Sequence, residues 1–154
     1  MRVNLHCSAS KFGNSCLIDR WHLERWRSGI GYHIVILNGW LTNTCYNRLF
    51  DGLIETGRPF DDDQLLDPWE HGAHIRGHND TIGICLIGDS GAFTDNQMKS
   101  LYDVLAWLHD LYGALKIGQH SDFDPSKPHC AGISKLDMEN LNAHFGVENL
   151  KKKA

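Results

Sequence analysis

Apolar and polar positions alternate with a period of two near the start of the chain. Residues 2–7 place three apolar side chains on one side, and His6 falls on the opposite, polar side. This alternation predicts a strand with one apolar face. The stretch TIGICLIG, residues 81–88, is instead apolar almost throughout. Such a run is typical of a central strand that is covered on both faces.

Helical spacing marks three other segments. The strongest pattern lies between Thr94 and Gly113, where leucines recur at helical spacing and Thr94 forms a capping-box pattern with Gln97. Residues 15–27 predict a shorter helix, and residues 134–145 predict the last one.

The remaining strands complete the pattern. YHIVIL, residues 32–37, predicts a strand that ends in a hairpin turn at Asn38-Gly39. GLIETG, residues 52–57, predicts the return strand, and LKIG, residues 115–118, predicts another. The order of strands and helices is then β, α, β, β, β, α, β, α. This order predicts an α/β fold with one mixed sheet covered by helices.

Length and charge limit the class of protein. With 154 residues the chain has the usual size of one domain, which we assign to residues 1–150, followed by a basic tail at 151–154. A net charge of -4 predicts no broad nucleic-acid footprint. The chain has no apolar run of about 18 residues, so we expect no membrane-spanning helix.

The two remaining compositional signals concern the compartment. The first ten residues, MRVNLHCSAS, lack the apolar core of a signal peptide, so we expect folding in a cytoplasm. The five cysteines are odd in number and have no compact spacing framework. We therefore expect reduced thiols rather than a disulfide scaffold.

Candidate chemistry gathers on the loop QHSDFDPSKPHCAG, residues 119–132. His120 directly follows a predicted strand, at the sheet edge where ligands commonly bind in α/β folds. His6 ends another strand on its polar side, and Cys130 lies in a proline-flanked loop that offers little burial. The three residues would supply two neutral imidazoles and one thiolate. This donor set suits zinc and leaves a fourth position for water.

Each of these residues has a plainer explanation when taken alone. A histidine at a strand end is more often an ordinary polar residue, and a cysteine is more often an inert buried thiol. Ten histidines also make chance clusters common. A structural zinc site closed by four ligands, with His129 as the fourth, is a further alternative.

Four stretches in order resemble a known family. They are HCSAS at 6–10, GYHIVI at 31–36, GAHIRGHNDTIGICLIGD at 72–89, and the loop from His120 to Gly132. Together they resemble the zinc-dependent N-acetylmuramoyl-L-alanine amidases of the amidase-2 group, which share a fold with the peptidoglycan recognition proteins. The likeness is strongest to the small phage lysozymes of amidase type, and it spans nearly the whole chain.

The resemblance implies roles for the matching residues. The three donors named above match the family's zinc ligands. Tyr32 matches the active-site tyrosine, and Lys127 matches the lysine just before the third ligand, so both are implied to be catalytic. His74, in GAHIRG, falls where the family lines the substrate groove.

Two departures from the family pattern matter. The family usually has one residue between the lysine and the third ligand, whereas Lys127 is followed by Pro128, His129 and Cys130. Counting from the lysine selects His129, and counting back from the Ala-Gly pair selects Cys130, which we prefer because a thiolate is the stronger zinc ligand. The second departure is TNTCYNRLF, residues 42–50, which resembles an insertion after the hairpin.

The implied activity is cleavage of the amide bond between N-acetylmuramic acid and L-alanine in peptidoglycan, with Zn²⁺ as cofactor. We expect a phage endolysin that stays in the host cytoplasm and reaches the cell wall on lysis. A cytoplasmic amidase that recycles muropeptides fits as well, and a non-catalytic peptidoglycan-binding module is the alternative from another class.

Partner expectations follow from the same reasoning. Peptidoglycan or a muropeptide is the expected substrate, with no nucleic acid, no membrane, and a monomeric chain. Some phage lysozymes of this type also inhibit the phage RNA polymerase, which the resemblance adds as a candidate partner.

Overall fold

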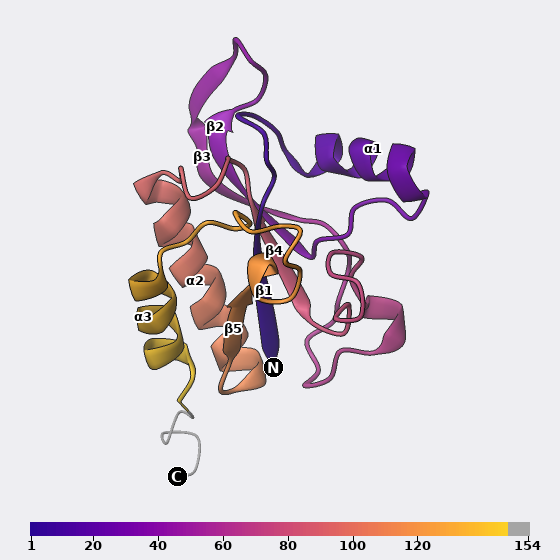
Figure 1. Cartoon of the computed structure of the whole chain (residues 1–154), viewed down its shortest axis with the longest axis vertical. Coiled ribbons are helices and arrows are strands. Elements are labelled where there is room, and N and C mark those ends of the chain that lie inside the picture. Colours follow the sequence, from indigo (N-terminus) through magenta and orange to yellow (C-terminus); the bar gives the residue numbers. More distant parts are fainter. Residues whose placement is uncertain (148–154) are drawn as a thin grey trace.

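The computed structural model describes residues 1–147, which form one mixed sheet with helices on both of its faces (Figure 1). The elements in chain order are β1 (Arg2–Cys7), α1 (Ser15–Trp26), β2 (Ile34–Trp40), β3 (Tyr46–Thr56), β4 (Ile82–Leu86), α2 (Asp95–Tyr112), β5 (Lys116–Gln119) and α3 (Lys135–Phe145). The predicted α/β class and the predicted order of elements are confirmed. The predicted basic tail lies outside the described residues.

The sheet brings the ends of three parallel strands to one edge. Its strand order is β3-β2-β4-β1-β5, and all neighbours pair in parallel except β3, which is antiparallel to β2. The carboxyl ends of β4, β1 and β5 therefore lie side by side. In open α/β sheets this edge is where ligands commonly bind.

Two hydrophobic cores hold the layers together. The larger core lies between the sheet and the pair α2 and α3, and it includes Leu5, Ile84, Leu105 and Leu141, all fully buried. The smaller core lies under α1 on the opposite face and contains Ile18, Val35, Leu37, Cys85 and Ile87. Strand β4 contributes to both cores, which confirms the prediction that it is central and covered on both faces.

The hairpin differs from the prediction. Strand β2 continues through Asn38 and Gly39, and its pairing with β3 shifts register on both sides of Asn38. Gly39 has a φ of 88°, a left-handed conformation that glycine adopts without strain. Its conformational freedom therefore permits the register shift within the strand pair rather than a turn. The turn lies further on, where the Thr42 hydroxyl accepts hydrogen bonds from the backbone N–H groups of Thr44 and Cys45. The turn prediction at Asn38-Gly39 was wrong because the chain reverses four residues later, in a turn that the Thr42 side chain caps.

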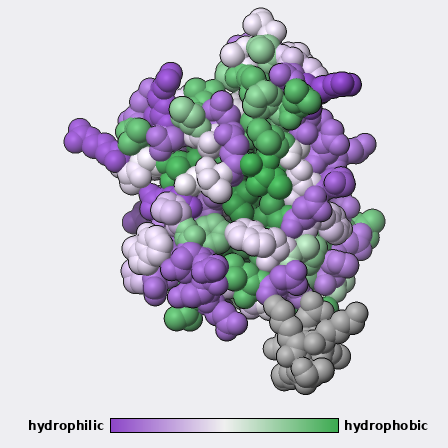
Figure 2. Space-filling view, turned by 180° about the vertical axis from the view of Figure 1, so that it is seen from behind, coloured by the Kyte–Doolittle hydropathy of each residue, from purple (hydrophilic) through white to green (hydrophobic). Residues whose placement is uncertain are grey.

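The predicted insertion, residues 42–50, forms the tip of this hairpin and the first part of β3. Strand β3 lies at the edge of the sheet and exposes several large apolar side chains: Tyr46, Leu49, Leu53 and Ile54. From behind, Figure 2 shows hydrophobic side chains gathered toward the hairpin end and in a central strip, flanked by hydrophilic ones. Among the described residues, none of the helices has the length and apolar character needed to cross a membrane.

Candidate metal centre

Three donor atoms from distant parts of the sequence meet at the sheet edge. They are His6 Nδ1, His120 Nδ1 and Cys130 Sγ, all within 4.8 Å of one another. The two nitrogens lie 3.2 Å apart, and the sulfur lies 4.0 Å from His6 Nδ1. Two nitrogen ligands at the usual zinc distance and a tetrahedral angle are about 3.3 Å apart. The nitrogen–nitrogen spacing and the chemistry of this donor set fit a tetrahedral zinc ion, whereas the sulfur lies farther from His6 Nδ1 than the roughly 3.5 Å that the same geometry gives.

Strand pairing explains why the two imidazoles meet. Leu5 on β1 pairs with Gln119 on β5. The residues that follow them, His6 and His120, therefore lie next to each other at this edge of the sheet. The loop carrying Cys130 is fastened there by two contacts. The Ser121 N–H donates to the Cys130 carbonyl at 2.7 Å, and the Cys7 N–H donates to the Cys130 sulfur at 3.4 Å.

The structure places the alternative ligand elsewhere. His129 is exposed to solvent, and within residues 1–147 the donor cluster holds three members, His6, His120 and Cys130. The cluster therefore offers three candidate donors and does not include His129.

His6 lies on the expected side of β1 but in an unexpected environment. It is opposite to the face that packs on α2, as the alternation predicts, yet its side chain is fully buried. Its second ring nitrogen, Nε2, lies 3.0 Å from His74 Nδ1, and His74 Nε2 lies 3.0 Å from the Thr81 carbonyl. The connection between β3 and β4 thus covers this face of the strand, which the sequence pattern did not indicate.

Burial keeps the imidazoles in the form that binds metal. It lowers the pKa of His6 well below the usual value, with the neighbouring His74 and His120 adding to the effect. Burial also lowers the pKa of His120, although Asp124 opposes the shift. Neutral imidazole is the ligand form of histidine, so neither ring needs to lose a proton at neutral pH.

The thiol of Cys130 has a close neighbour in Cys7. A hydrogen bond with the Cys7 side chain and burial both raise the pKa of Cys130, whereas the backbone N–H of Cys7 lowers it. The same thiol–thiol contact lowers the pKa of Cys7 to about 6. The pair therefore favours a single thiolate. A cation bound at Cys130 would place that negative charge on Cys130 rather than on Cys7.

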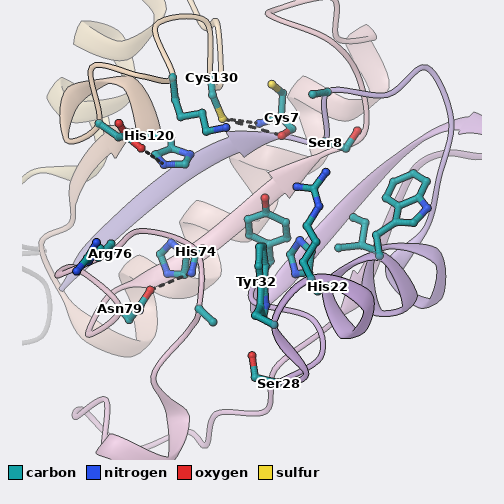
Figure 3. Close-up of a pocket in the computed structure, with 18 residues that line it drawn as sticks. Cys7, Ser8, His22, Ser28, Tyr32, His74, Arg76, Asn79, His120 and Cys130 are labelled. Carbon is teal, nitrogen blue, oxygen red and sulfur yellow. Dashed lines mark hydrogen bonds and ion pairs between the residues drawn. The ribbon is translucent and has the colours of Figure 1, made fainter.

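A cavity of about 620 Å³ lies beside the donor cluster, and two of the three donor residues, His120 and Cys130, line it. Tyr32 and Lys127 both line it, together with His120, Cys130 and His74. Figure 3 shows the Tyr32 hydroxyl directed toward the side of the cavity where Cys130 lies. The Tyr32 and His6 rings lie 4.9 Å apart between centroids, and burial raises the pKa of the phenol well above its usual value. Tyr32 is therefore a neutral hydrogen-bond donor beside His6.

The charge of the cavity wall is opposite to that of the whole chain. Among the residues that the structure describes, its cationic side chains are Arg25, Arg76 and Lys127, and its one carboxylate is that of Asp124. Asp124 Oδ2 faces His120 Nε2 at 3.7 Å, so this charge is directed at one of the three candidate donors. The rest of the cavity wall is cationic and therefore suits a substrate that carries carboxylates.

Sequence patterns missed His22 as part of this cavity. The sequence predicts only that His22 lies on a helix, but the residue is 8% exposed and its Nδ1 accepts a hydrogen bond from the Gly31 N–H at 2.9 Å. Its ring also lies 5.3 Å from that of Tyr32. The helical pattern of α1 is too weak to show which face is covered, so no signal in the sequence identified it.

Comparison with solved structures places this arrangement in a known fold. N-acetylmuramoyl-L-alanine amidase LysC from Clostridium intestinale URNW superposes with a TM-score of 0.71 at 25% identity, covering 96% of this chain and 85% of that one. The Ph2119 endolysin from the Thermus scotoductus MAT2119 bacteriophage Ph2119 gives 0.67 at 19% identity, covering 96% and 84%. Drosophila PGRP-LB gives 0.61 at 24% identity, covering 85% and 74%.

These likenesses confirm the fold that the four sequence stretches implied: the chain has the fold shared by amidase endolysins and peptidoglycan recognition proteins. No family model and no curated protein matches the sequence.

Proposed function

We propose that this protein is a zinc-dependent N-acetylmuramoyl-L-alanine amidase, which hydrolyses the amide bond between the lactyl group of N-acetylmuramic acid and L-alanine in peptidoglycan. One observation carries the proposal: His6, His120 and Cys130 form a zinc-type donor set, and two of them, His120 and Cys130, line a cavity. The similarity at 25% identity to a protein described as an amidase of this specificity supports the choice of reaction.

The residues around the donors suit amide hydrolysis. A zinc ion held there would lower the pKa of a water molecule from 15.7 to about 7 and polarise the amide carbonyl. Lys127 lies on the same loop as Cys130 and lines the cavity, so its ammonium can stabilise negative charge that develops on the carbonyl oxygen. The neutral phenol of Tyr32 can donate a hydrogen bond that orients the attacking water or the substrate.

The cationic wall agrees with the proposed substrate. Stem peptides of peptidoglycan carry free carboxylates, and Arg25 and Arg76 lie on separate parts of the cavity wall where they can pair with such groups. A structural relative, a mutant of Drosophila PGRP-LB, has been solved in complex with tracheal cytotoxin.

An endolysin is the biological role we favour, with the enzyme held in the host cytoplasm until lysis gives access to the wall. Two solved relatives described as endolysins are covered over more than four fifths of their length, which supports this role over a recycling enzyme.

The test uses purified protein and purified peptidoglycan. We expect about one zinc per chain and release of new L-alanine amino groups without new reducing sugar ends. A chelator should abolish release, and added zinc should restore it. Peptidoglycan binding without amine release in the zinc-loaded protein would contradict the proposal and favour a non-catalytic binding module.

A further inference from the structure

We propose that His74 is a positioning residue that fixes the tautomer of His6, so that Nδ1 of His6 carries the lone pair that faces the other two donors. The inference rests on the proposed function only in taking zinc as the ion that the cluster binds. It assigns His74 to the support of the metal centre rather than to the substrate groove that the resemblance implied.

The direction of the hydrogen bonds follows from the carbonyl at the end of the chain. The Thr81 carbonyl can only accept, so His74 Nε2, 3.0 Å away, must carry the proton. A neutral His74 then has its lone pair on Nδ1, which faces His6 Nε2 at 3.0 Å. His6 must therefore donate from Nε2, and its Nδ1 is left unprotonated. One carbonyl thus determines the tautomers of two successive imidazoles.

The acceptor that sets this direction is itself fixed. Thr81 is 1% exposed, and its hydroxyl accepts from Asn4 Nδ2 at 2.8 Å while donating to the His78 carbonyl at 2.7 Å. The backbone N–H of His74 donates to Asn79 Oδ1 at 2.9 Å. Both ends of the contact between His74 and Thr81 are therefore tied to the surrounding structure.

Two glycines shape the space in which the His74 ring lies. A Cβ atom added at Gly72 would stand 2.2 Å from His74 Cδ2, and one added at Gly83 would stand 2.7 Å from the same atom. Any side chain at either position would displace the ring. Gly83 lies within the apolar run of β4, so this role gives a physical reason for a glycine in a central strand.

The same contacts leave no ring nitrogen of His74 for a substrate. The side chain is 9% exposed, and each nitrogen already has a partner inside the protein. His74 contributes to the cavity wall, but its polar atoms are directed at the first ligand and at the backbone. Its effect on the reaction should therefore act through His6.

Removing His74 should weaken metal binding by a measurable factor. With an apolar residue at position 74, the Nε2–H of His6 loses its buried acceptor. The other tautomer, with the proton on Nδ1, then competes with zinc. Changes to such outer partners of metal ligands typically cost about 10–100-fold in metal affinity.

The experiment compares His74→Leu with His74→Gln. The glutamine carbonyl can accept from His6 and its amide can donate to Thr81, so it should rescue most of what leucine loses. We would measure the zinc Kd by chelator competition, and the tautomer of His6 by ¹⁵N NMR of the metal-free protein with labelled histidine. His109→Leu is the matched control, because His109 is also 9% exposed and bonded through Nε2 to a carbonyl, that of Val147, in another part of the fold.

We expect His6 to be protonated on Nε2 in the unmodified, metal-free protein, and zinc affinity to fall about 10–100-fold in His74→Leu but not in the control. A proton on Nδ1 of His6 in the unmodified protein would overturn the inference, whether or not any variant folds. Unchanged zinc affinity in folded His74→Leu together with lost hydrolysis would overturn it in favour of substrate contact. If the unmodified protein binds zinc but hydrolyses nothing, the proposed function fails while the role of His74 stands.

Discussion

Lys127 illustrates how a single side chain gains meaning from its neighbours. Its backbone N–H donates to the Asp124 carbonyl and its carbonyl accepts from the Cys130 N–H, so the backbone next to Cys130 positions it. Its side chain is exposed and lines the cavity. Nothing in the residue type alone separates it from an ordinary surface lysine, and the proposed catalytic role depends on the family resemblance and on its place beside the donor cluster.

Replacing Lys127 by alanine should lower kcat by about 100-fold or more, the usual loss on removing an oxyanion donor. The loss should fall on kcat rather than KM alone, because the interaction strengthens as charge develops on the carbonyl oxygen. Steady-state kinetics on a soluble muropeptide, with zinc content measured for each variant, provide the check. Lys99→Ala, which removes an exposed lysine paired with Asp103 on α2, is the control and should leave kcat unchanged. Near-normal kcat in zinc-loaded Lys127→Ala would remove the residue from the mechanism.

The choice between the two adjacent candidate ligands gives a second test. Cys130→Ser should reduce zinc affinity by more than the roughly 10–100-fold typical of outer partners, because a thiolate is replaced by a neutral hydroxyl. His129→Ala should leave affinity unchanged, because His129 is exposed and outside the cluster. Chelator competition measures both. The reverse order of effects would mean that the ligand is one residue earlier in the loop.

Sequence reasoning reached the donors of this site but not their surroundings. His6 and His120 end strands, and Cys130 lies in a proline-flanked loop, so position along the chain pointed to all three. The contacts of His74 with His6 and of Cys7 with Cys130 depend on how the connections fold back over the sheet. Such long-range approaches leave no periodic trace in the sequence.

At the scale of elements, the capping box at the start of α2 also joins the helix to the sheet. Gln97 is fully buried, and its amide nitrogen donates to the carbonyls of Ile36 at 3.0 Å and Ile87 at 2.8 Å. Its side-chain oxygen accepts from the Thr94 N–H at 3.0 Å. One residue thus caps a helix and binds β2 at Ile36 and the residue that follows β4, whereas the sequence predicted only the capping role.

Gln97→Leu should therefore destabilise the protein by about 2–4 kcal/mol, because buried carbonyl acceptors lose a donor and the cap is lost as well. Chemical denaturation gives the free energy of unfolding. The neighbouring variant Asn96→Ala serves as the control, since its side chain makes one exposed contact with Asp51 and should change stability by less than about 0.5 kcal/mol. Equal effects of the two changes would show that the contacts of Gln97 with the sheet contribute little.

At the same scale, periodicity predicted elements better than it predicted turns. The helix α2 and the central strand β4 were predicted because each buries a continuous apolar pattern. The Asn38-Gly39 hairpin was not found, because a bulge and a threonine cap both compete with the local Asn-Gly preference.

At the scale of the whole molecule, the fold places several imidazoles in buried or half-buried positions. The pKa values of His6, His22, His33, His74 and His120 are all lowered, and burial is the largest cause for each. All five are therefore neutral in the folded protein at neutral pH. Unfolding returns each one to water, where it takes up a proton near its usual pKa of 6.5.

The metal-free protein should accordingly lose stability as the pH falls from about 7 to 5. A pKa that is lower in the folded state means that the unfolded state binds more protons in this window. The free energy of unfolding therefore rises with pH, and the contribution of these histidines reaches its full value only above the unfolded pKa.

His22 gives the cleanest single contribution, because its pKa is lowered to about 4 and it lies outside the donor cluster. His22→Gln should remove about one proton from the uptake that accompanies unfolding over this range, measured from the pH dependence of denaturant unfolding. His129→Gln, at an exposed position, is the control. Stability that does not change between pH 7 and 5 in the metal-free protein would mean that these imidazoles accept protons without unfolding, and the neutral interior described above would be wrong.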